Sequence, residues 1–153
     1  MKKKIFVFLT FFPLFLFGGV FEHLLGKDVQ YLFQHQFRCH DGTCISPEKN
    51  IFDNDTIESS VKFVKAFLDH EERVFKVEVE LNLFEEDKEA FFDAIIQVSD
   101  KSGKISYDLQ STYDKYGNHS IIYLIDKERK KSYMNHLTKQ YAQAMKSYKP
   151  EAQ

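Results

Sequence analysis

Glycine and cysteine are scarce in this chain: its 153 residues include only six glycines and two cysteines. Two of the glycines, Gly18 and Gly19, lie in an apolar N-terminal run, so few remain for loops that bind phosphate. The Gly-x-Ser-x-Gly pattern, a phosphate loop and a glycine-rich dinucleotide turn are all absent. We therefore expect no cofactor, and we find no motif of a nucleophilic enzyme.

The histidines form no recognisable catalytic or metal-binding pattern. The six are scattered over the chain: His23, His35, His40, His70, His119 and His136. His70 precedes two glutamates but lacks the second histidine of a zinc protease motif. The acidic run of Glu85, Glu86 and Asp87 is interpreted as a solvated loop between strands. These patterns favour a protein that is not an enzyme.

The two cysteines, Cys39 and Cys44, lack the spacing of a thioredoxin-type or c-type haem motif. A close, even pair in an exported protein indicates a disulfide. Two alternatives stay open, a redox-active pair and a zinc site completed by His35 and His40. Against zinc, neighbouring strand residues such as Cys39 and His40 point to opposite faces.

The first 21 residues predict export. Lys2, Lys3 and Lys4 precede an apolar run that ends near Gly18-Gly19, the pattern of a secretory signal. Cleavage and retention as a membrane anchor both stay open, while the missing cysteine argues against a lipoprotein. Residues 22–150 are then a single exported domain, either periplasmic or anchored to the inner membrane and facing the periplasm.

A hairpin is expected around the cysteines, because apolar and polar residues alternate from Val29 to Cys39, interrupted only at Leu32 and His35, and Asp41-Gly42 is a strong turn signal. An amphipathic helix is expected over residues 54–69. Alternation then predicts four strands, over 75–83, 92–98, 104–109 and 120–125. Short connections make residues 73–126 an antiparallel meander.

A second amphipathic helix is predicted over residues 127–148, before Pro150. Its apolar stripe is expected to face the sheet and comprises Met134, Leu137, Tyr141, Met145 and Tyr148. Its solvent-facing lysines form the candidate interaction surface: Lys130, Lys131, Lys139 and Lys146.

Charge is separated along the chain. Residues 127–149 carry seven basic side chains against Glu128 alone, whereas residues 53–89 hold 12 acidic and five basic ones. The basic helix therefore has three interpretations: a core-packing helix with a solvated lysine face, a helix on an anionic membrane surface, or a helix on an acidic protein partner. Nucleic acid is not expected, because the exported part as a whole is acidic.

These patterns predict an α+β fold in which a disulfide-clipped hairpin and a four-stranded meander are packed by two amphipathic helices. They favour a non-catalytic, exported cell-envelope protein that acts as a binding or assembly module. Its partner is an envelope protein or an anionic membrane surface. The alternative is a carrier or sensor that holds an apolar ligand between the sheet and its helices.

Overall fold

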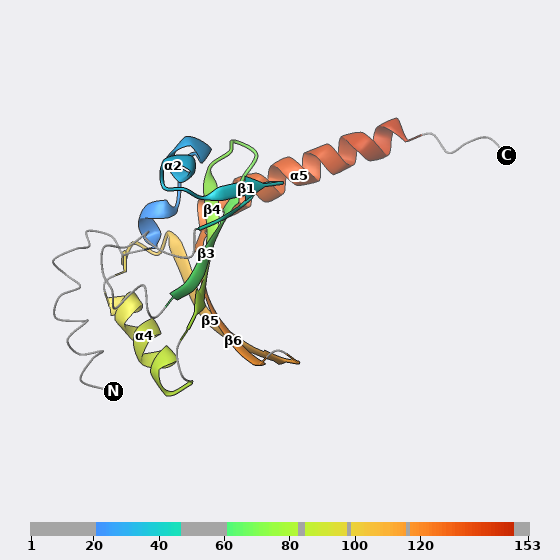
Figure 1. Cartoon of the computed structure of the whole chain (residues 1–153). Helices are drawn as coiled ribbons and strands as arrows, with labels where there is room; N and C mark the ends of the chain where they lie inside the picture. The colour runs from blue at the N-terminus through green and yellow to red at the C-terminus, as the bar shows by residue number, and fades with distance from the viewer. Residues whose placement is uncertain (1–20, 47–60, 83–84, 98, 116, 149–153) are drawn as a thin grey trace.

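The computed structural model describes residues 21–46, 61–82, 85–97, 99–115 and 117–148. Apart from Phe21, the predicted signal or anchor segment lies outside these ranges, as do residues 54–60 of the helix predicted over 54–69. The fold is α+β and contains a six-stranded antiparallel sheet (Figure 1). Its strands are β1 (Arg38–His40), β2 (Thr43–Ile45), β3 (Val61–Leu68), β4 (Val74–Leu81), β5 (Ile105–Asp114) and β6 (Gly117–Asp126). The helices are the 3-10 turn η1 (Glu22–Leu24), α2 (Val29–Gln34), α4 (Glu85–Gln97) and α5 (Lys127–Ser147).

The predicted hairpin at the cysteines is confirmed. Asp41 and Gly42 connect β1 to β2 and both have positive φ, 48° and 79°, which is the conformation that a two-residue type I′ turn requires. Cys39 and Cys44 face each other in the register and form a disulfide. This bond uses both sulfur atoms that a zinc site would need. A disulfide is typical of proteins in oxidising compartments outside the cytoplasm.

The segment before the hairpin is a helix, so the strand predicted from Val29 onward is wrong there. Asp28 caps α2, because its Oδ1 accepts a hydrogen bond from the Tyr31 backbone N–H at 2.9 Å. Tyr31 and His35 stack one turn apart with ring centroids 4.2 Å apart. Leu32, which interrupted the alternation of the sequence, is fully buried. The Asp28 cap and the Tyr31–His35 stacking stabilise a helix here, although the alternation of apolar and polar residues favours a strand.

The helix predicted over 54–69 is also wrong for its second half, which forms β3. This strand lies between β2 and β4, and it buries Val64 and Ala66, two residues apart, on the core face of the sheet. Its apolar residues fit helical spacing as well as alternation, so periodicity did not distinguish the two structures. Pairing on both edges provides the backbone hydrogen bonds that decide in favour of a strand.

The predicted meander is wrong in one element, because residues 85–97 form α4 in place of a strand over 92–98. The acidic residues 85–87 begin this helix, where its dipole favours negative charge, so they are not a loop between strands. Phe91, Ala94 and Ile95 are buried at helical spacing. The helix carries the chain across the sheet, so β4 pairs with β6 and not with β5. The strand order is β1-β2-β3-β4-β6-β5.

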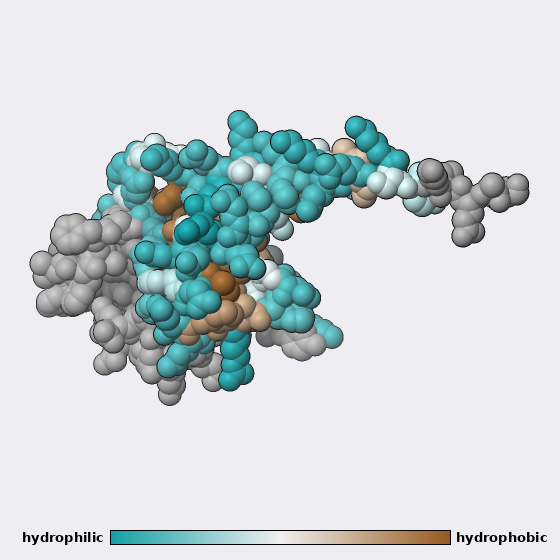
Figure 2. All heavy atoms as spheres, turned by 90° about the horizontal axis from the view of Figure 1, so that it is seen from above, coloured by the Kyte–Doolittle hydropathy of each residue, from teal (hydrophilic) through white to brown (hydrophobic). Residues whose placement is uncertain are grey.

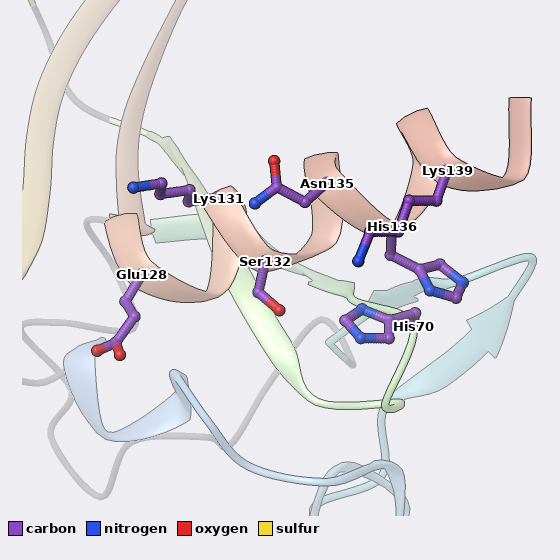
Figure 3. Close-up of a pocket in the computed structure, with 7 residues that line it drawn as sticks. All are labelled: His70, Glu128, Lys131, Ser132, Asn135, His136 and Lys139. Atoms are coloured by element: carbon purple, nitrogen blue, oxygen red, sulfur yellow. The ribbon is translucent and has the colours of Figure 1, made fainter. Parts of the chain in front are cut away.

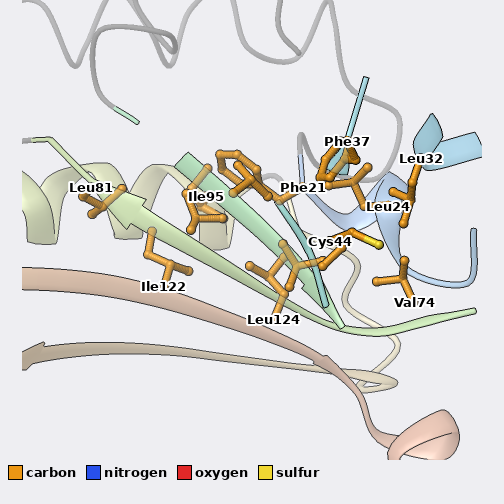
Figure 4. Packing of buried hydrophobic residues seen from close by; sticks show 14 of the residues in the cluster. Phe21, Leu24, Leu32, Phe37, Cys44, Val74, Leu81, Ile95, Ile122 and Leu124 are labelled. Atoms are coloured by element: carbon orange, nitrogen blue, oxygen red, sulfur yellow. The ribbon is translucent and has the colours of Figure 1, made fainter. Parts of the chain in front are cut away.

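The core lies on one face of the sheet, where η1, α2 and α4 pack (Figures 1 and 4). Val77 and Val79 of β4 and Ile122 and Leu124 of β6 are fully buried there. Figure 4 shows Ile95 of α4 and Phe21 close to these strands. The helices predicted to cover this face were those over 54–69 and 127–148, and the prediction is wrong for both: residues 61–68 form β3, and α5 buries no residue and extends away on the other side (Figure 1). Helix α4, which was not predicted, packs on the face with η1 and α2.

Candidate functional site

Helix α5 projects from the sheet and forms the candidate site. It continues directly from β6, and its first turn is capped by Asp126, whose Oδ1 accepts a hydrogen bond from the Arg129 backbone N–H at 3.1 Å. Its 21 residues span roughly 30 Å. Helix α5 therefore extends well beyond the end of the strand that begins it (Figure 1).

The first half of α5 is attached to the β3–β4 turn by an ion pair. Arg129 Nη1 lies 3.2 Å from Asp69 Oδ2, and the Asp69 side chain is only 1% exposed. The same carboxylate accepts hydrogen bonds from the backbone N–H groups of Glu71 and Arg73 through its other oxygen. Asp69 thus organises the turn and anchors the helix at the same time.

Aromatic contacts complete this attachment. Tyr133 packs on Phe75 of β4 with ring centroids 5.1 Å apart, and His136 stacks on His70 with centroids 4.3 Å apart. Tyr133 and His136 lie four and seven residues after Arg129, so the three side chains share one side of the helix. They are the only residues of α5 that are not exposed.

The second half of α5 lies in solvent. Every residue from Leu137 to Tyr148 is exposed. The apolar stripe, expected to face the sheet, is instead in solvent, with exposed fractions of 51% for Met134, 38% for Leu137, 68% for Tyr141, 54% for Met145 and 69% for Tyr148. That expectation is wrong because the helix leaves the sheet after two turns, and because its attached side lies roughly a quarter-turn away from the stripe. Seen from above, most of its surface is hydrophilic (Figure 2).

The four lysines of the candidate interaction surface, Lys130, Lys131, Lys139 and Lys146, are all exposed. They do not share one side of the helix. Lys139 and Lys146 are seven residues apart and lie together, whereas Lys130 is nine residues from Lys139 and lies on the opposite side. Lys139 and Lys146 also lie opposite the apolar stripe. Lys139 is two residues before Tyr141 and Lys146 is five residues after it, and each offset places the lysine roughly half a turn away from Tyr141. The stripe and the paired lysines are thus two separate surfaces.

A polar pocket of about 480 Å³ lies where α5 meets the β3–β4 turn (Figure 3). Its lining combines residues of both elements: His70, Glu128, Lys131, Ser132, Asn135, His136 and Lys139. Figure 3 shows the two imidazole rings side by side, one from each element. Charged and polar side chains surround the space, so this pocket is not the apolar cavity that a carrier of an apolar ligand needs.

A second polar cluster lies on the sheet face opposite the core. His119 of β6 is hydrogen-bonded through Nδ1 to Glu80 Oε1 at 2.9 Å and through Nε2 to Asp114 Oδ1 at 3.2 Å. Lys62 Nζ lies 3.8 Å from Glu80 Oε1. The hydrogen bond to Glu80, followed by the influence of Asp114, raises the pKa of the imidazole above its usual value of 6.5, while burial acts in the opposite direction.

This cluster makes stability depend on pH. The paired, protonated His119 contributes fully below the unfolded-state pKa of about 6.5, and its contribution is lost as pH rises through the higher pKa of the folded state. We expect the free-energy difference between the wild type and His119→Gln to shrink as pH rises above about 6.5. Urea titrations over the range from about pH 5.5 to pH 9 measure it. A difference that stays constant over this range would contradict the expectation.

The sequence did not reveal these clusters. Glu80 and His119 each occupy the polar face of an alternating strand, but only the pairing of β4 with β6 brings them together. The sequence predicted a strand over 92–98 in place of α4, so it did not indicate that β4 pairs with β6. Similarly, nothing in the sequence connects Asp69 with Arg129, 60 residues later. Among the described residues, no three histidine, cysteine, aspartate or glutamate side chains are placed to hold a metal ion.

Two further results bear on the site. Within the described part of the chain, no helix combines the length and the apolar character needed to cross a bilayer. Comparisons of the chain with protein-family models, with curated proteins and with solved structures find no match.

Proposed function

We propose that this protein is a non-catalytic, exported module of the cell envelope that binds another protein through the apolar stripe of α5. The observation that carries the proposal is the second half of α5, residues 137–148, where Leu137, Tyr141, Met145 and Tyr148 are exposed along one side of the helix. Burial of such a stripe against a partner removes apolar area from water at about 25 cal/mol per Å². An exposed apolar stripe bordered by polar residues is a mark of an interaction surface.

Lys139 and Lys146 favour a protein over a membrane surface as the partner of the second half of α5. Lys139 and Lys146 lie on the side of α5 opposite the stripe. A helix that inserts its stripe into an anionic bilayer would hold these two charges far from the lipid phosphates, where they attract little. A protein groove accepts the stripe and leaves both lysines in water, which costs nothing in desolvation.

Export supports a partner in the envelope. The Cys39–Cys44 disulfide is typical of an oxidising compartment, and the lysine-led apolar N-terminus is typical of a secretory signal. Together they favour the periplasm, or attachment to the inner membrane on its periplasmic side. In that location the projecting helix is free to meet other envelope proteins.

The test compares two surfaces of the second half of α5. The stripe variant carries Leu137→Gln and Tyr141→Gln, and the matched control carries Lys139→Gln and Lys146→Gln. Native mass spectrometry of protein recovered from the envelope of expressing cells measures the bound mass. We expect bound protein for the wild type and the control but a single chain for the stripe variant. A stripe variant that keeps its partner would contradict the proposal.

A vesicle experiment distinguishes the membrane alternative. The wild type and both variants are sedimented with vesicles of phosphatidylglycerol and phosphatidylethanolamine at low and high salt. We expect no difference between the wild type and the lysine control. Sedimentation that requires Lys139 and Lys146 and disappears at high salt would show that an anionic membrane is the partner.

A further inference from the structure

A seam of coiled-coil spacing runs along the stripe of α5, with Ala144 in place of Met145. Met134, Leu137, Tyr141, Ala144 and Tyr148 follow one another at steps of three, four, three and four residues, which is the pattern of the first and fourth positions of a heptad. All five are exposed. A helix that presents such a seam has another helix as its natural partner, because side chains of each fill the spaces between side chains of the other.

The residues that flank this seam carry no charge. In the second half of α5 they are Thr138, Gln140, Met145 and Ser147, and the two lysines occupy the outermost heptad position. Flanking charges normally select between different coiled-coil partners. Without them, two identical helices meet with no like charges across the seam. An acidic partner helix would find no cation there to pair with.

Helix dipoles and side-chain size both favour an antiparallel arrangement. Parallel helices place their dipoles side by side in the same direction, whereas antiparallel helices oppose them, which is more favourable. An antiparallel pair also sets the large Tyr141 against the small Ala144, whereas a parallel pair sets each residue of the seam against its own copy. Lys139 and Lys146 do not distinguish the two arrangements, because they lie on the outer side of the helix in both.

We propose that the protein forms a dimer in which the second halves of α5 from two copies pair in antiparallel orientation. In this pairing Tyr141 lies opposite Ala144 of the second copy, and Leu137 lies opposite Tyr148. Large residues thus meet small ones at the centre, and the overlap comprises residues 137–148 alone. The inference rests on the proposed function and names its partner as a second copy of this chain.

The body of the protein leaves room for this pairing. Arg129, Tyr133 and His136 attach α5 through a side that lies roughly a quarter-turn from the seam. A second helix can therefore occupy the seam without displacing these contacts. Because the overlap over residues 137–148 is less than two heptads long, we expect a dimer in the micromolar range of affinity, which forms at the high local concentration of an envelope protein.

Cysteine cross-linking in the full chain tests the arrangement directly, because the two native cysteines are bonded to each other. Two differently tagged chains are expressed together, one with Leu137→Cys and the other with Tyr148→Cys. A short thiol-specific cross-linker is expected to join them. Leu137→Cys chains are not expected to link to one another, because in antiparallel helices these positions lie 11 residues apart, about 16 Å.

The matched control uses Lys139→Cys in one chain and Lys146→Cys in the other. These two positions lie at the same level of the antiparallel pair but on its outer sides, so no cross-link is expected. In addition, Leu137→Gln is expected to raise the Kd of dimerisation about a hundredfold in sedimentation equilibrium, because each dimer loses two buried leucines.

Four outcomes would overturn the inference. Equal cross-linking at the inner and outer pairs would show random collision, and self-linking of Leu137→Cys would show parallel helices. A monomer at all concentrations, whose association with the envelope still requires the stripe, would show that another protein is the partner and would leave the proposed function intact. A monomer whose envelope association does not depend on the stripe would contradict both.

Discussion

Replacing Leu124 by alanine is expected to lower the free energy of unfolding by about 3 kcal/mol, because the change removes three carbon atoms from a closely packed core. Leu124 is fully buried on β6, where it is paired in register with Val77 of β4 and Tyr107 of β5. Figure 4 shows its side chain within the buried cluster. Strand β6 is hydrogen-bonded to β4 on one side and to β5 on the other, so it has little freedom to close the cavity. Urea unfolding followed by far-ultraviolet circular dichroism measures the loss.

The matched control for this prediction is Leu137→Ala in α5. Leu137 is 38% exposed and is not part of the buried core, so we expect a change of less than about 0.5 kcal/mol. Both variants are measured at low protein concentration, where association adds no stability. A loss for Leu137→Ala as large as that for Leu124→Ala would show that the stripe packs on the sheet after all.

Replacing Asp69 by alanine is expected to cost about 3 kcal/mol, which is large for a single polar residue. The change removes the acceptor of two backbone hydrogen bonds in the β3–β4 turn and the partner of Arg129. The Asp69 side chain is 1% exposed, so water cannot replace it without opening the turn. Thermal unfolding and urea unfolding both measure the effect.

Two further variants separate the roles of Asp69. Asp69→Asn keeps an oxygen that accepts from the Glu71 and Arg73 backbone N–H groups but loses the charge, so we expect a smaller loss. Arg129→Gln keeps the turn and removes only the attachment of α5. Because Arg129 is 29% exposed, we expect about 1 kcal/mol. Equal losses for Asp69→Ala and Arg129→Gln would show that the ion pair, and not the turn, is the source of the stability.

Several elements could be predicted from local sequence. The alternation from Phe75 to Leu81, the turn at Asp41-Gly42 and the apolar spacing after Asp126 each predict one structure, and the structure has it. Residues 61–68 and 85–97 were assigned the wrong structure, because their apolar residues fit both periods. The candidate site was predicted in part: α5 was expected, but its apolar side was placed on the sheet.

What the sequence by itself determined is local. A disulfide-closed hairpin, three strands and a basic C-terminal helix follow from residues close to one another in the chain, because turn geometry, alternation and capping act over a few positions. Only the tertiary structure decided which strands pair and which surfaces stay in solvent. Helix α4 covers the core face, β6 lies next to β4, and Asp69 holds Arg129. These contacts place α5 so that its stripe points into water, because an amphipathic helix buries its apolar side only where the rest of the fold provides a surface for it.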